Sequence, residues 1–247
     1  MSFDLTVLTP HLEPLLAGAL LTAEVCALGI VGAFGLATVL GLAAAGGGGG
    51  RGWAQRSAWL YVDVFRNVPF VVQVFFLYYG LPEIGVYIDA FWTGVLALSL
   101  VGGAYGGDVV RSGILAVDPG VVEAARVGGL PRLDIIRRIV LPIALRAAIR
   151  PLGSVFVNLV LSSSILSMIT LDEVTGTARG VAAETYRPFE VYAFLLVAYA
   201  VLTYAVSLGI AALHRHLNRH MAAGNITGGH GAAGPGVAGP EVAGKGA

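Results

Sequence analysis

The sequence predicts an all-α protein that crosses a membrane with five helices, its N-terminus outside and its C-terminus in the cytoplasm. Of its 247 residues, 56% are hydrophobic and only 12% are charged, and the mean hydropathy is +0.80. A soluble domain carries about a quarter charged residues, so this chain is suited to lipid. Two further observations support the prediction. Several apolar segments are long enough to span a bilayer, and the basic residues are concentrated in the segments on one side of the predicted spans.

The apolar segments have the length that a crossing of the hydrocarbon layer requires, about 20 residues. The first, 15–45, exceeds one span, so we expect the crossing from about Cys26 to Ala45 and an interfacial lead-in at 15–23. The glycines at 46–50 predict a flexible turn. Further spans are expected at 58–81, 91–110, 147–169 and 189–213. Pro69 predicts a kink in the second of the five, which serves either gating or packing.

Basic residues set the orientation of a membrane protein. Segments 46–57, 111–150 and the residues after 214 carry twelve Lys and Arg, whereas the loops 82–90 and 170–188 carry two. The first group is therefore predicted to be cytoplasmic. We expect an external segment at 1–14, a transmembrane domain at 15–220 and a disordered Gly/Ala/Pro-rich tail at 221–247. The first apolar segment lacks a preceding basic region, so we expect it to be retained rather than cleaved as a signal peptide.

Composition argues against several classes of function. A net charge of zero gives no reason to expect nucleic-acid binding. The single cysteine, Cys26, excludes an intrachain disulfide and a multi-cysteine metal site. The histidines lie outside the apolar segments or at their edges, and no nucleophile with a histidine partner and no paired aspartates occur in the spans. The only lysine, Lys245, is not part of a phosphate-binding loop. We therefore expect no catalytic and no metal site.

The loop 112–146 is predicted to contain two short helices. Asp118 before Pro119 is a good N-cap, and Gly128 and Gly129 end that first helix. Pro131 begins the second, which we expect Pro142 to interrupt. This second helix has an apolar stripe opposite its charged residues; the stripe is Ile135, Ile136, Ile139 and Val140, and the charged residues are Arg132, Asp134 and Arg138. Residue chemistry alone would also fit an amphipathic loop lying on the lipid headgroups.

The same loop carries the pattern EAA-x3-G-x9-I-x-L-P. It consists of Glu123, Ala124, Ala125, Gly129, Ile139, Leu141 and Pro142. This pattern resembles the cytoplasmic EAA loop of permease subunits of bacterial ATP-driven (ABC) importers. Residues 61–81, YVDVFRNVPFVVQVFFLYYGL, resemble the second-span signature of the polar amino-acid uptake branch, which includes histidine-, glutamate- and glutamine-type permeases. The similarity is collinear from about residue 12 to 220.

The resemblance implies a type I importer permease fold in the bacterial cytoplasmic (inner) membrane. In that family the EAA loop docks on a separate cytoplasmic ATPase, which holds the ATP and magnesium, so no cofactor is implied for this chain. A second permease subunit, identical or homologous, and an extracytoplasmic solute-binding protein are further implied partners. The implied cargo is a polar amino acid, with glutamate, glutamine and basic amino acids as candidates.

Polar residues within the spans are candidates for the solute path or its gate, because they face protein or water rather than lipid. Asp63 and Arg66, like Asp108 and Arg111, are spaced for local ion pairs, with gating as the alternative. Nearer mid-span, Gln73 and the three serines Ser162, Ser163 and Ser164 either contact solute or pack helices. The family has a charged pair where this chain has Leu161-Ser162, which leaves open which permease chain recognises the solute.

The aromatic run Phe75, Phe76, Tyr78 and Tyr79 is typical of a membrane interface. A self-sufficient secondary transporter or channel is the main alternative function. Such proteins commonly contain inverted repeats, and this sequence shows no internal repeat.

Overall fold

The computed structural model describes residues 5–45 and 52–222, and every regular element within these ranges is a helix. The predicted turn at 46–50 and nearly all of the predicted tail lie outside the described residues. In chain order the elements are η1 (Leu5–His11), α1 (Leu12–Ala45), α2 (Trp53–Asn67), α3 (Phe70–Phe75), η2 (Phe76–Gly80), η3 (Leu81–Ile84), α4 (Ala90–Leu115), α5 (Pro119–Val127), α6 (Arg132–Ile135), η4 (Ile136–Val140), α7 (Leu141–Ser162), η5 (Ser163–Ile169), α8 (Val174–Thr185) and α9 (Pro188–Ala222).

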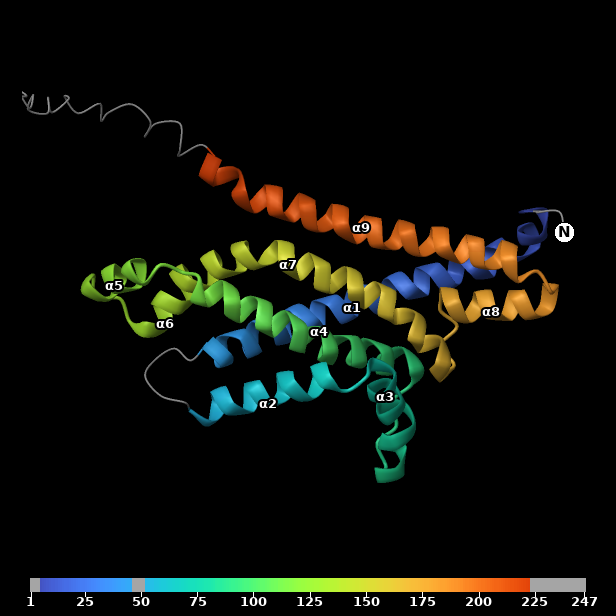
Figure 1. Cartoon of the computed structure of the whole chain (residues 1–247), viewed down its shortest axis with the longest axis horizontal. Helices are drawn as coiled ribbons and strands as arrows, with labels where there is room; N and C mark the ends of the chain where they lie inside the picture. The colour runs from blue at the N-terminus through green and yellow to red at the C-terminus, as the bar shows by residue number, and fades with distance from the viewer. Residues whose placement is uncertain (1–4, 46–51, 223–247) are drawn as a thin grey trace, which may run out of the picture.

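The centre of the bundle is the pair α1 and α4, which lie against each other along most of their length (Figure 1). Small residues allow this approach. A Cβ atom on Gly102 of α4 would lie only 2.6 Å from the Cβ of Ala33 of α1, and one on Gly106 only 2.7 Å from that of Ala37. Close backbone contact through small residues is the usual packing mode in membranes, where lipid is as apolar as the side chains.

The first span is one continuous helix. The lead-in expected at 15–23 is not a separate element, because α1 runs from Leu12 to Ala45 without a break. Within that stretch Leu15 and Thr22 are buried. Gly18 lies so close to α8 that an added Cβ would be 2.8 Å from the hydroxyl of Thr177. The extra turns of α1 are therefore covered by α8, which sequence periodicity does not show.

The second span is broken where the sequence predicts a kink. Helix 53–67 and the helical segment 70–84 meet at an angle of 104°. Val68 and Pro69 between them are extended (ψ 130° and 136°), as expected for a residue before proline and a helix-initiating proline. Four helices of the described chain are long and apolar enough to cross a membrane, and the bent pair would supply a fifth crossing.

The predicted interruption at Pro142 is wrong. The helical path is continuous from Arg132 to Ile169, and Pro142 lies in the first turn of α7. Proline lacks an N–H and its ring collides with the carbonyl four residues earlier. Here the preceding turn, Ile136–Val140, widens into a π-helix, which accommodates the ring without bending the helix. The loop is thus rigidly joined to the fourth span.

Candidate functional site

The EAA loop forms a compact end of the molecule, where α5 and α6 extend beyond the spans (Figure 1). The predicted cap is present, because Oδ1 of Asp118 accepts a 2.7 Å hydrogen bond from the backbone N–H of Gly120. Gly129 has φ +75°, the left-handed conformation that glycine adopts without strain. The chain therefore turns back at Gly129 as predicted.

The two alanines of the EAA pattern have different environments. Glu123 and Ala124 are exposed, whereas Ala125 is only 9% exposed. Ala125 packs in a small apolar cluster with Val117, Ile135, Val140 and Ala144. Ala125 thus fastens α5 to the helix behind it, and Glu123 and Ala124 are available to a partner.

The remaining residues of the pattern lie behind α5. Ile139, Leu141 and Pro142 are half-buried in the helix that leads from α6 into α7. Asp134 and Arg138 on the outer side of that helix form an ion pair of 3.4 Å. The predicted stripe is confirmed, since Ile135 and Val140 are buried.

A second candidate region is a cavity of about 500 Å³ beside the break in the second span. It lies between the α2–α3 junction, α4 and α7. Its lining comprises Phe65, Arg66, Asn67, Val68, Pro69, Phe70, Val101, Tyr105, Val155, Asn158, Leu159 and Ser162. Arginine, amide and hydroxyl groups thus share the cavity with apolar walls, which is the composition of a small-solute site.

The charged residues near this cavity pair differently from the local prediction. Arg66 binds Asp108 of α4, with 2.9 Å between Nη1 and Oδ2, and its guanidinium also lies 5.3 Å from the centre of the Tyr105 ring. Arg111 instead stacks over Trp59 at 4.6 Å. The packing of α2 on α4 brings these groups together. The ion pair therefore links two spans, whereas the predicted local pairs would each have neutralised charges within a single span.

The structure separates the other predicted path residues. Gln73 is buried, and its Nε2 donates to the carbonyls of Phe65 and Val68, at 2.9 Å each. It therefore pairs backbone groups that the break leaves free. Ser163 is buried and donates to the carbonyl of Val160, while Ser164 donates to that of Leu161. Of the three serines, Ser162 lines the cavity.

Sequence reasoning missed Asn158, which is exposed on α7 and lines the cavity with Ser162. The signal was present as a four-residue spacing of polar groups along an otherwise apolar span, from Arg150 through Ser154 to Asn158 and Ser162. Residues at that spacing share one helix face.

Sequence reasoning also missed Glu173, which lies in the loop 170–188 and was not named as a candidate. Glu173 is 1% exposed and caps α8 by accepting from the N–H of Gly176 at 3.1 Å. Thr22 of α1 and Tyr199 of α9 each donate to its Oε2 at 3.2 Å. Burial raises the pKa of this carboxyl. Glu173 thus joins α1, α8 and α9 at the end of the bundle opposite α5.

Comparisons with known proteins agree with this arrangement. Residues 37–223 match the family described as binding-protein-dependent transport system inner membrane component. The chain is 30% identical over 220 residues to the glutamine transport system permease protein GlnP of Escherichia coli (strain K12), covering 88% of this chain and 99% of that protein. It is 36% identical over 176 residues to the nopaline transport system permease protein NocM of Agrobacterium fabrum, covering 67% of this chain and 73% of NocM.

Solved structures show the same fold. A crystal structure of an amino acid ABC transporter with histidines superposes with a TM-score of 0.76 at 29% identity, covering 87% of this chain and all of that chain. An inward-facing structure of the MetNI methionine ABC transporter has a TM-score of 0.70 at 18% identity, which shows likeness of fold alone. This chain therefore belongs to the binding-protein-dependent transport system inner membrane component family, as a permease subunit of an amino-acid ABC importer of the inner membrane.

Proposed function

We propose that this permease moves a polar amino acid into the cell by alternating access, driven by a separate ATPase that docks on α5. The observation that carries the proposal is the placement of Glu123 and Ala124. Both are exposed on a short, capped helix at one end of the bundle. A helix of this kind moves as one body and fits a partner's cleft.

A rigid connection leads from that docking helix into the membrane. Ala125 packs α5 against Ile135, and the helical path from Arg132 to Ile169 has no break. A helix transmits displacement along its axis because its backbone hydrogen bonds run from turn to turn. A push on α5 therefore reaches Ser162 in the cavity wall. The orientation that basic residues predict puts α5 in the cytoplasm, where an ATPase acts.

The cavity at the span break supports a polar cargo. Arg66, Asn158 and Ser162 supply hydrogen-bond donors and acceptors beside apolar walls, and an amino acid carries both charged groups and a side chain to match them. Relatives named for glutamine and nopaline transport favour an amino acid or an amino-acid derivative as cargo. Within the candidates from the sequence, glutamine has the most direct support.

The exposed face of α7 supports a second permease subunit. Asn158 is exposed on α7, and a polar side chain on a spanning helix faces protein or water rather than lipid. A second copy or a homologous chain would close this face and complete the path. A solute-binding protein would deliver cargo to the opposite end of the bundle, near α8.

Charge reversal on α5 tests the docking. Glu123→Arg should reduce ATPase co-purification and energised uptake at least tenfold, while membrane insertion stays normal. Glu184→Arg is the matched control for attachment, because Glu184 is exposed on α8 at the other end of the bundle (Figure 1). It should leave ATPase co-purification at the wild-type level. Unchanged attachment in Glu123→Arg would refute docking on α5, and solute flux through this chain alone would favour a secondary transporter.

A further inference from the structure

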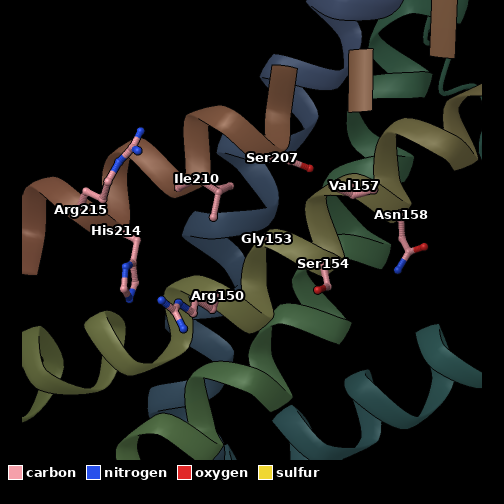
Figure 2. A pocket seen from close by; sticks show the side chains of 10 residues that line it. Arg150, Gly153, Ser154, Val157, Asn158, Ser207, Ile210, His214 and Arg215 are labelled. Carbon is pink, nitrogen blue, oxygen red and sulfur yellow. The ribbon is translucent and has the colours of Figure 1, made fainter. Parts of the chain in front are cut away.

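A further cavity of about 600 Å³ lies between the middle of α7 and the C-terminal half of α9, and it shares Asn158 with the cavity beside the span break. Figure 2 shows its side chains. The residues that line it come from two helices only: Arg150, Gly153, Ser154, Val157 and Asn158 from α7, and Ser207, Ile210, Ala211, His214 and Arg215 from α9. Neither the docking of an ATPase on α5 nor the binding of cargo beside the span break assigns a role to this cavity.

The cationic part of this cavity lies at the edge of the hydrocarbon layer. The fourth span ends at Ile169, and a crossing takes about 20 residues. Counting back from Ile169 reaches Arg150. On α9 the apolar run ends at Leu213, directly before His214. Arg150 and His214 are therefore level with each other at the headgroups on the side of α5, which basic residues predict to be the cytoplasmic side.

On α7 and α9 the charge at this level has one sign. The sequence contains no Asp or Glu between Asp134 and Asp172, nor between Glu190 and Glu241. Among the residues that the structure describes, none forms an ion pair with Arg150. Figure 2 shows Arg150 and His214 reaching toward each other from α7 and α9, and Ser154 lies one turn further along α7. The cavity thus offers an uncompensated cation and further donors to an anion.

The rest of the lining is largely apolar. Val157, Ile210 and Ala211 line the cavity toward the membrane centre, where Asn158 and Ser207 add an amide and a hydroxyl. Gly153 allows α9 to approach α7 closely there, because an added Cβ would lie 2.8 Å from Ile210. Cationic groups at headgroup level followed by apolar walls toward the bilayer centre match an amphipathic ligand. A free anion would gain nothing from the apolar half.

We propose that this cavity binds the phosphate headgroup of an anionic phospholipid from the cytoplasmic leaflet. The guanidinium of Arg150 donates two parallel hydrogen bonds to the phosphate, as arginine commonly does, with Ser154 and His214 as further partners. The first part of an acyl chain lies against Val157, Ile210 and Ala211. Basic pockets between spanning helices on the cytoplasmic side are typical headgroup sites.

Native mass spectrometry of the purified full-length permease tests this site, with phosphatidylglycerol and phosphatidylcholine of identical acyl chains as probes. Wild type should retain phosphatidylglycerol in preference to phosphatidylcholine. Arg150→Gln should lower the bound phosphatidylglycerol about fivefold, the effect of one basic residue near an anionic surface, and Arg150→Lys should restore part of it. Arg56→Gln removes an equal charge from the exposed end of α2 and should change nothing.

Five outcomes would overturn the proposal. Equal retention of the two lipids, or an equal loss in Arg56→Gln, would mean that binding is nonspecific. Displacement of phosphatidylglycerol by millimolar inorganic phosphate would identify a site for a free anion. A change in the number of permease chains in Arg150→Gln would identify a subunit contact. Impaired uptake by Arg150→Gln in vesicles of pure phosphatidylcholine, with lipid retention unchanged, would assign Arg150 to the cargo path.

Discussion

Proline breaks the second span at Pro69, whereas the helix that joins the EAA loop to the fourth span continues through Pro142. At Pro69 the chain becomes extended for two residues, and the helices on either side meet at 104°. At Pro142 the preceding turn widens into a π-helix and the axis continues. The same residue type thus gives a bend beside the cavity of the second span and a straight element behind α5.

The two prolines differ in which donors pair the backbone carbonyls that each proline leaves without a partner. At the break, the carbonyls of Phe65 and Val68 accept hydrogen bonds from the side chain of Gln73. These two carbonyls are therefore paired inside the protein although the helix is interrupted there. At Pro142, the wider turn retains pairing within the helix. A buried carbonyl without a donor is costly, so the fate of each proline depends on the donors near it.

The largest expected effect comes from removing the donor at the break. Gln73→Leu leaves two carbonyls unpaired and should lower the free energy of unfolding by about 2 kcal/mol. Thermal unfolding in detergent measures this. Gln55→Leu is the matched control, because Gln55 makes one bond, to the carbonyl of Ala44 at 3.1 Å, near the end of a helix. Its loss should be smaller, and equal losses in the two variants would contradict the role given to Gln73.

Next in size, the two prolines themselves should respond differently to alanine. Pro69→Ala restores an N–H and removes the restriction on Val68, so the bend should partly straighten. A spin-label pair at the exposed positions Trp53 and Ile84 should then report longer distances. Pro142→Ala should leave that distance unchanged and alter stability by less than about 1 kcal/mol, because the helix there is already straight. A shift in both variants would mean that the bend does not depend on Pro69.

A pH titration should distinguish the two ends of the bundle. Buried polar groups around Glu173 stabilise the end opposite α5, whereas apolar packing stabilises the EAA loop. Burial raises the pKa of Glu173 above its ordinary value of 4.5. The unfolded chain therefore loses this proton first as pH rises, and the contribution of Glu173 to stability is greatest in acid and declines toward the native pKa. Thermal unfolding should show this decline in wild type. Glu173→Gln should flatten it, and an unchanged slope would refute the assignment.

The smallest effect is expected for the ion pair beside the break. Arg66 and Asp108 are 41% and 36% exposed, so solvent screens their attraction. A double-mutant cycle with Arg66→Gln and Asp108→Asn should give a coupling energy of about 0.5 kcal/mol in unfolding measurements. A coupling energy above 2 kcal/mol would show that the pair is a main support of the bend.

Several features follow directly from the sequence because their causes are local. The cap at Asp118, the turn at Gly129 and the break at Pro69 depend on residues within a few positions, and each is present. The apolar stripe on Ile135 and Val140 follows from helical periodicity in the same way. The family was also identifiable, because its pattern occupies one continuous segment.

Other features depend on segments far apart in the chain. Arg66 pairs with a residue 42 positions away, where a local partner at Asp63 had been predicted. Glu173 is buried by Thr22 and Tyr199 from two other helices. Spacing cannot distinguish Ser162, which lines the cavity, from the buried Ser163 next to it. These outcomes depend on how neighbouring helices pack.

The sequence by itself determined the membrane setting, the approximate spans, the capped helix α5 and the permease family. Apolar length, charge distribution and backbone preferences are properties of contiguous residues. Only the tertiary structure decided which polar groups face one another: Gln73 with the open backbone, Arg66 with Asp108, and Arg150 with His214 across a cavity. The physical reason is that hydrogen bonds and ion pairs form over a few ångströms of space, whatever the distance along the chain.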